Sequence, residues 1–324
     1  MSLRPKNRFV GMIVLSLLLS GGIAGCKHNE GDSVIVTGEG ARLSSEAIDK
    51  DPLALLPANP VVLGWVDAQA FFASPFGGEL NRLANKYVPL GQQAGFVAQR
   101  DLKKVVGGVY SLAGADVVAV AQGDFNPEMI RSAMEQRAVT PSGVSIVHSK
   151  YAGNDVYTAG NIGFTVVTKH TLLVGNETGM RRALDRIRDN RVKREIPEWM
   201  TKLMDNPQAS TVLAGDVAGQ PQVAAMAKMA PFLNGLSNFR ILGNFQPPGL
   251  NLAGTLSYPD PTSAAAGANA LRSVAQMASW MNVLAIIGIT SPLQSLQVNT
   301  QDSDTMFVTA LDAQSLTRLL AQVM

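Results

Sequence analysis

The sequence predicts an α+β fold made of two related repeats, each an antiparallel sheet with helices packed on one face. Two strand–turn–strand segments, 105–127 and 239–261, align without gaps at an offset of 134 residues. The same offset brings 171–184 onto 305–320, and each of these is a strand that runs into an amphipathic helix. Hairpins join antiparallel strands, and helices interspersed among them cover a sheet, so we expect α+β architecture in both halves.

Residues 1–25 have the layout of a secretory signal peptide. Three basic residues, Arg4, Lys6 and Arg8, precede an uncharged run from Phe9 to Cys26. This run is 18 residues long, whereas a membrane-spanning helix needs about 20 apolar residues. A basic start, a short apolar stretch and small residues are typical of a removable signal peptide.

The end of this segment, Ile23-Ala24-Gly25-Cys26, resembles the lipobox of bacterial lipoproteins. The resemblance covers about the first 26 residues, and it implies that Cys26 is lipidated and begins the mature chain. Lys27, rather than an aspartate, follows the cysteine; similarity to the sorting rule of enterobacterial lipoproteins then implies the outer membrane. The alternative is an uncleaved N-terminal anchor. In the lipoprotein reading, acyl chains hold the protein at the membrane without a span.

Charge and cysteine content exclude two classes of protein. The full chain has a formal net charge of +2, and removal of the signal peptide leaves 24 basic and 25 acidic residues, or −1. A nearly neutral chain has no overall field to attract nucleic acid, so no nucleic-acid partner is expected. Cys26 is the only cysteine, so a disulfide-stabilised domain is excluded.

The remaining chain divides into three parts. Residues 26–52 are polar and contain glycine and serine, which predicts a flexible tether with a reach of about 25–30 Å. The first α+β repeat is expected at 53–196 and the second at 197–324. No apolar run beyond the signal peptide is long enough to span a membrane, since the longest is 283–289.

Each repeat is expected to begin with a strand and a helix, at 61–72 and 211–222, and to continue with the aligned hairpin. A helix should follow each hairpin, because Asn126 and Asp260 have the chemistry of an N-cap and a proline follows each of them. Half-polar strands follow at 145–151 and 155–160, so one sheet face should meet water. The helix predicted at 262–281 places Leu271, Val274, Ala278 and Met281 on one face.

The body is similar to uncharacterised extracytoplasmic bacterial proteins. The resemblance rests on Leu55–Ala58, on a strand that ends at Asp67, and on Tyr151, Gly153 and Tyr157. It implies no activity.

Catalytic motifs do not occur in the sequence. The three histidines, His28, His148 and His170, include no pair at the spacing of a helical metal site. No G-x-S-x-G nucleophile turn, serine–lysine motif or glycine-rich phosphate loop is present. We therefore expect no catalytic residue, metal or cofactor.

A basic cluster follows the strand at 171–175. It comprises Arg181, Arg182, Arg186, Arg188, Arg191, Lys193 and Arg194. These residues could contact anionic lipid head groups, since each basic residue near such a surface contributes about 1 kcal/mol. The alternative is a solvated helix face, because Asp185 and Asp189 are interleaved among them.

The second half is poor in charge and rich in methionine. Residues 201–324 contain five basic and six acidic residues, while Met226, Met229, Met277, Trp280 and Met281 lie in its predicted helices. Methionine fills irregular cores, and it also lines adaptable binding surfaces. We therefore interpret these residues first as part of the core. The alternative is that they contact an apolar ligand or a partner.

Together these features indicate a lipid-anchored, non-enzymatic envelope lipoprotein with a structural or protein-interaction role. The alternative is a carrier of lipid or another apolar ligand. A hydrolase with a scattered acid pair is the third and least favoured reading.

Overall fold

The computed structural model describes residues 43–78, 94–114, 116–137, 139–140, 143–283 and 293–314. The signal peptide and the lipidation site Cys26 lie outside these residues, so both stay predictions.

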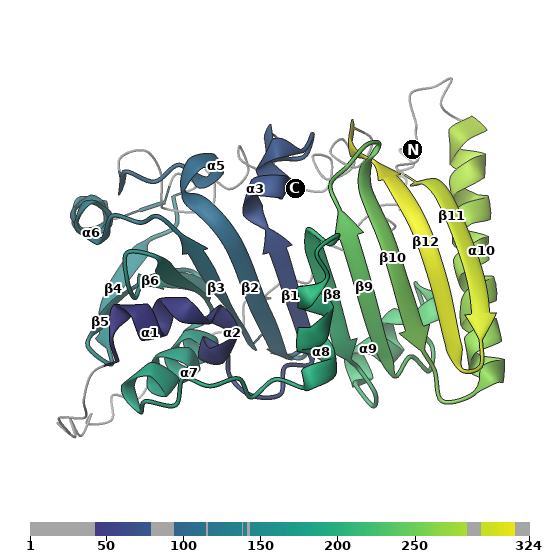
Figure 1. Ribbon diagram of the computed structural model, residues 1–324, viewed down its shortest axis with the longest axis horizontal. Helices are drawn as coiled ribbons and strands as arrows, with labels where there is room; N and C mark the ends of the chain where they lie inside the picture. Colours follow the sequence, from purple (N-terminus) through teal and green to yellow (C-terminus); the bar gives the residue numbers. More distant parts are fainter. Residues whose placement is uncertain are drawn as a thin grey trace, which may run out of the picture.

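Among the described residues, one antiparallel sheet of twelve strands runs through both halves of the chain (Figure 1). The strand order is β11-β12-β10-β9-β8-β1-β2-β3-β7-β6-β5-β4. The first half contributes β1 (Val62–Asp67), β2 (Leu102–Ser111), β3 (Asp116–Gly123), β4 (Ile146–Tyr151), β5 (Asn154–Ala159), β6 (Ile162–Val166) and β7 (Thr171–Gly175). The second half contributes β8 (Thr211–Asp216), β9 (Asn238–Asn244), β10 (Gly249–Ser257), β11 (Leu293–Gln301) and β12 (Asp304–Asp312).

The helices lie between these strands and before them. They are α1 (Ser45–Lys50), α2 (Pro52–Leu55), α3 (Ala68–Ala73), α5 (Ala98–Asp101), α6 (Pro127–Glu135), α7 (Glu177–Arg188), α8 (Glu198–Lys202), α9 (Pro221–Met226) and α10 (Pro261–Val283), with short 3-10 turns at Leu203–Asp205 and Pro231–Leu233. The predicted α+β class is confirmed.

The order of strands is repeated on the two sides of the β1–β8 pair. Outward from this pair the first half reads β1-β2-β3-β7-β6 and the second half reads β8-β9-β10-β12-β11. The aligned segments 105–127 and 239–261 lie on the matching hairpins β2–β3 and β9–β10. Among the described residues, the β4–β5 hairpin of the first half has no counterpart in the second half.

The two helices after these hairpins begin at the predicted caps. Asn126 Oδ1 accepts a hydrogen bond from the backbone N–H of Met129 at 3.1 Å, and α6 follows. Asp260 Oδ1 accepts one from the N–H of Ser263 at 2.9 Å, and α10 follows. Each cap satisfies one of the free N–H groups at a helix start.

One expectation was a sheet for each repeat, but β1 and β8 pair in antiparallel register and join the two sheets into one. Each is the first strand of its half, so in a separate repeat each would have a free edge. Pairing the two removes both free edges.

The tether predicted for 26–52 is wrong at its C-terminal end, because residues 45–52 form α1 and the start of α2. Ile48 of α1 is buried in the core. Asp49 Oδ1 accepts hydrogen bonds from the hydroxyls of Thr168 and Thr171, the latter at 2.6 Å. The folded part therefore begins at the Ser44 cap, and the rest of the predicted tether, 26–42, lies outside the described residues.

Helices cover both faces of the sheet, so the expectation of helices on one face of each repeat is wrong for the first half, where α7 and α6 lie on opposite faces. On one face, here called the α7 face, Leu63, Val118 and Leu173 pack against Met180 and Leu184 of α7. Figure 1 shows α1, α2 and α7 together on this side of the first half. Met200 of α8, just beyond the predicted boundary between the repeats, is also buried in this core.

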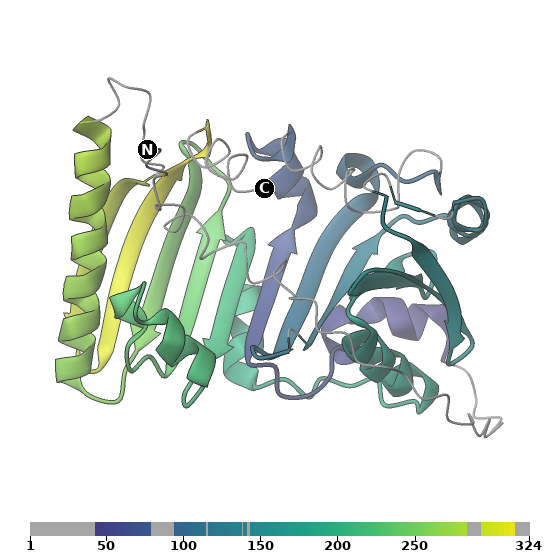
Figure 2. The same cartoon turned by 180° about the vertical axis from the view of Figure 1, so that it is seen from behind.

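The opposite face, here called the α6 face, carries two further cores. Ile130 and Met134 of α6 pack against Ala121 and Leu172 in the first half. In the second half, Leu271 of α10 packs in a cluster with Leu256, and strand register places Leu256 on the α6 face. Figure 2 shows α9 and α10 over this side of the sheet.

Candidate functional site

The candidate site lies where the sheet ends, at the hairpin β4–β5. Ala152 and Gly153 join the two strands, with φ of 48° and 78°. Positive φ at both central residues is the geometry of a type I′ turn, whose twist matches that of the strands it joins. Six residue pairs from Ile146↔Ala159 to Tyr151↔Asn154 then fix the register of the hairpin.

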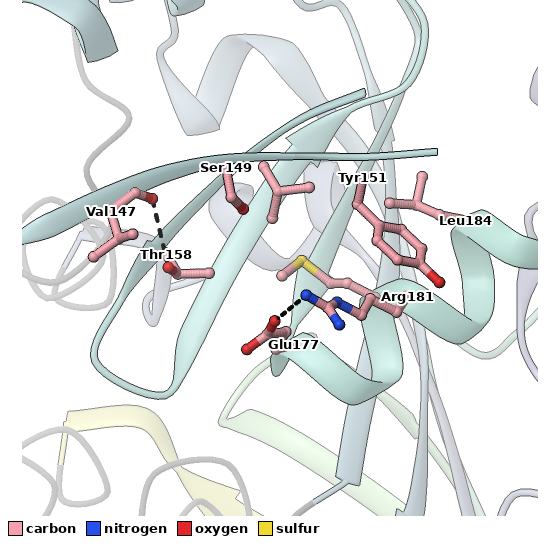
Figure 3. Close-up of a pocket in the computed structure, with 9 residues that line it drawn as sticks. Val147, Ser149, Tyr151, Thr158, Glu177, Arg181 and Leu184 are labelled. Carbon is pink, nitrogen blue, oxygen red and sulfur yellow. Dashed lines mark hydrogen bonds and ion pairs between the residues drawn. The ribbon is translucent and has the colours of Figure 1, made fainter. Parts of the chain in front are cut away.

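Alternation along the strands and helical spacing along α7 build a groove between them (Figure 3). It encloses a cavity of about 140 Å³. Val147, Ser149 and Tyr151 line it from β4, Val156 and Thr158 from β5, and Glu177, Met180, Arg181 and Leu184 from α7. The floor is apolar because Val156, Met180 and Leu184 are buried. We call this feature the β4–α7 groove.

Polar contacts fix the helix side of the groove. Arg181 Nη2 lies 2.5 Å from Glu177 Oε1, and its guanidinium carbon lies 4.8 Å from the centre of the Tyr151 ring. The Tyr151 hydroxyl donates to Asp185 Oδ1 at 2.9 Å. Burial, followed by this hydrogen bond, raises the pKa of Tyr151, so the hydroxyl stays protonated and remains a donor at neutral pH.

The strand side of the groove is open. β4 is the last strand of the sheet, so its outer edge has no strand partner in the described part of the chain. Val147 is 58% exposed. Lys150 is exposed too, and it forms no ion pair with any described residue.

The α6 face of the same hairpin is held by aromatic stacking. The rings of His148 and Tyr157 are stacked with centres 4.9 Å apart, and Tyr157 stacks on Phe164 at 5.3 Å. Asp155 Oδ1 lies 3.0 Å from His148 Nε2, and Asp155 Oδ2 lies 3.3 Å from Arg131 Nε. These contacts hold β4 in place although it is an edge strand.

The structure pairs all seven residues of the predicted basic cluster with acidic groups. Arg181 pairs with Glu177, Arg182 with Asp116, Arg186 and Lys193 with Glu195, Arg188 with Asp185 and Asp189, Arg191 with Asp189, and Arg194 with Asp51. They therefore do not form one unpaired basic surface, and head-group contact stays a prediction.

Arg186 differs most from a solvated helix face, because its side chain is only 4% exposed. It donates to the carboxylate of Glu195 at 2.7 Å, to Lys193 O at 2.6 Å, and to Ala54 O at 3.3 Å. Its position beside Ala183 and Ile187, on the apolar side of α7, was the sequence feature that could have indicated burial.

The methionines predicted in helices of the second half are not all core residues, and Met229 lies in the turn after α9 rather than in a helix. Met229 is 58% exposed and Met277 is 49% exposed, so the core interpretation is wrong for these two residues. Met226 is half-buried. Trp280 and Met281 lie in α10, but their side chains are outside the described residues. Contact of this set with a ligand or partner stays a prediction.

The described part of the chain contains no group of three His, Cys, Asp or Glu side chains arranged to hold a metal ion. His170 contacts Gly123 O and Asp124, away from the groove. None of the helices described is both long and apolar enough to cross a bilayer.

Comparisons with known proteins show the fold. No family model and no curated protein matches the sequence. Crystal form III of TP0453 is 11% identical, with a TM-score of 0.56, over 84% of this chain and 98% of TP0453. Crystal form I matches at 11% identity and a TM-score of 0.52, over 84% of this chain and 97% of TP0453. The chain shares the fold of TP0453. At this identity the similarity concerns architecture alone.

Proposed function

We propose that the protein is a lipid-anchored lipoprotein of the bacterial cell envelope that acts by binding another protein rather than by catalysis. The lipobox at 23–26 supports the anchor. The β4–α7 groove, at an open sheet edge, is the observation that carries the binding role. Lys27 after the cysteine supports placement in the outer membrane by the sorting rule to which it is similar.

The charges around the groove favour binding over hydrolysis. A general acid or base needs a titratable group free to exchange a proton with substrate. Here Glu177 is held by Arg181, and Asp185 is held by Arg188 and the Tyr151 hydroxyl. These carboxylates are therefore engaged in pairs with neighbouring side chains rather than free to take up a proton from a substrate.

The anchor is tested by growth with an alkyne-bearing palmitate analogue and fractionation of the envelope. The natural chain should be labelled and recovered with outer membranes. Cys26→Ser should be unlabelled and leave the membrane fraction. Equal labelling of both proteins would contradict the lipoprotein assignment.

The binding role is tested by crosslinking in intact cells at native abundance. A discrete crosslinked species, lost in a groove variant such as Val147→Asp, is expected. If the protein stays uncrosslinked at native abundance, the interaction role is contradicted.

A second candidate function is the binding of a lipid or another apolar ligand. It is favoured by the α7 face of the second half, where Val308 is 55% exposed and Met306 is 36% exposed. Figure 1 shows no labelled helix over β10 and β12 on that side. Native mass spectrometry of unlipidated protein should then show a co-purified lipid, and Val308→Asp should lose it. Absence of both a co-purified lipid and fluorescent fatty-acid binding would reject this function.

A further inference from the structure

We infer that the β4–α7 groove binds an extended segment of a partner protein, which adds to the sheet as the next strand beside β4. The inference rests on the proposed binding role and specifies its partner. The required segment has apolar side chains on the face toward α7 and an acidic side chain on the other face, opposite Lys150.

The backbone of β4 supports strand addition. An edge strand presents alternate N–H and C=O groups with no partner, and these groups are a template for another strand. β4 is six residues long and is registered along its whole length by β5. On the α6 face, the stack of His148, Tyr157 and Phe164 packs β4 against β5 and β6. The template is therefore formed before any partner arrives.

The groove supplies a place for side chains of the added strand. Side chains of a strand alternate between its two faces, so every second one would point toward α7. There it would meet exposed Val147, small Ser149 and the apolar floor formed by Val156, Met180 and Leu184. The cavity of about 140 Å³ offers room for one large apolar side chain. Pockets for alternate side chains give specificity in this mode of peptide recognition.

Charge supports a partner rather than a second copy of this chain. Strand alternation places Lys150 on the α6 face, where it has no ion-pair partner among the described residues. β4 has the sequence IVHSKY and carries no acidic residue, so β4 of a second copy would offer no carboxylate to Lys150. A segment of a different protein, with an acidic residue at this register, would offer a carboxylate to Lys150.

The hairpin is also an addition to the repeated fold. The second half, within the described residues, passes from β10 through α10 to β11 and has no strands equivalent to β4 and β5. The groove is therefore not required by the repeat architecture.

The test uses the unlipidated full chain (Cys26→Ser) and a fluorescein-labelled eight-residue peptide that alternates valine and threonine, with one threonine replaced by aspartate. Binding is measured by fluorescence anisotropy. We expect saturable binding, weakened at least tenfold by Val147→Asp and by Ser149→Trp, which fills the cavity. Leu213→Asp is the control, because it changes an exposed apolar residue of β8 outside the groove, and it should bind as the unsubstituted chain does.

A charge exchange tests the register. Lys150→Glu should weaken binding of the aspartate peptide severalfold and should bind a lysine version of the peptide better than the aspartate version. Hydrogen exchange should show slower exchange of amides in 146–151 when peptide is bound, with no change in β11. Circular dichroism and thermal melts of every variant separate loss of binding from loss of folding.

Absence of saturable binding, or equal binding by folded Val147→Asp, overturns the inference. A concentration-dependent dimer that Val147→Asp abolishes would overturn it in favour of a second copy. Labelling of Cys26 with the palmitate analogue and crosslinking in cells are independent of the peptide. If Cys26 is labelled and a crosslinked partner is found while the peptide does not bind, the proposed function stands and only this inference is rejected.

Discussion

At the scale of single residues, charge is used inside the molecule as well as on its surface. The Arg186 guanidinium joins α7 to α2 and to the segment after α7, through Ala54 O, Lys193 O and Glu195. A buried cation is tolerated because each of its three nitrogens donates to an oxygen. Arg188, two residues further along α7, has a side chain that is 52% exposed, and it pairs with its sequence neighbours Asp185 and Asp189.

Arg186→Ala should therefore lower the free energy of unfolding by about 3–5 kcal/mol, because it leaves buried acceptors unpaired. Arg188→Ala, the control at an exposed pair, should cost about 0–1 kcal/mol. Urea denaturation measures both. Similar losses in the two variants would contradict the structural role of Arg186.

The same substitution should change the dependence of stability on pH. Arg186 lowers the pKa of Glu195, so the folded state binds that proton more weakly than the unfolded state does. This contribution is present above the unfolded pKa of glutamate, near 4.3, and is lost as pH falls through the lower folded pKa. Denaturation midpoints between pH 7 and pH 3 should fall less steeply in Arg186→Ala than in the natural chain.

Ala152 is strained in the turn that shapes the groove, since its φ is 48°. A left-handed conformation costs a residue with a Cβ about 1–2 kcal/mol, and asparagine tolerates it better. Ala152→Asn should thus raise the free energy of unfolding by up to about 1 kcal/mol. Thermal melts measure the change, and Ala159→Asn at the other end of β5 should give no gain.

At the scale of elements, the position of α7 on the sheet determines the width of the β4–α7 groove. The helix starts at the Asn176 cap, whose Oδ1 accepts from both Gly179 N and Val117 N, so one side chain joins helix and strand. Gly179 lies against the carbonyl of Val117, where a Cβ would meet backbone. A side chain at this position would push α7 away from β3.

Gly179→Ala should therefore destabilise the protein by about 1–3 kcal/mol, as expected for overpacking. It should also weaken binding of the peptide, since Glu177, Met180 and Arg181 move with the helix. Thr178→Ala, an exposed neighbour, is the control. Urea denaturation and anisotropy together check the prediction, and an unaltered midpoint would show that α7 can shift without cost.

At the scale of the whole molecule, the β1–β8 pair makes two repeats into one body. Leu63 of β1 is fully buried in the same cluster as Ala214 of β8. The two halves therefore share both a strand pair and a core, so we expect them to unfold together.

Leu63→Ala should cost about 2–5 kcal/mol. Hydrogen exchange with mass spectrometry should show that amides in β3 and in β10 lose protection by the same amount. Loss confined to the first half would show that the halves unfold independently.

Local features of the sequence predicted much of this fold. Alternation and turn residues indicated the hairpins, and Asn126 and Asp260 before prolines marked the two helix starts. The constant offset indicated the repeat. These features depend on residues close together in the chain, where backbone sterics and capping bonds act. The groove could not be predicted in this way, since its walls come from β4, β5 and α7, and only packing brings them together.

By itself, then, the sequence indicated the order of strands and helices and the repeat, and it predicted a lipobox at Cys26. Only the tertiary structure decided that β1 meets β8, that Asp49 docks α1 on Thr168 and Thr171, and that Arg186 is buried while Met277 is exposed. The physical reason is that periodicity shows which face of a helix or strand is apolar. It does not show which strand edge pairs with which, or which acidic group pairs with a given basic side chain. Those partners follow from long-range burial, where the loss of water makes an unpaired group too costly to keep.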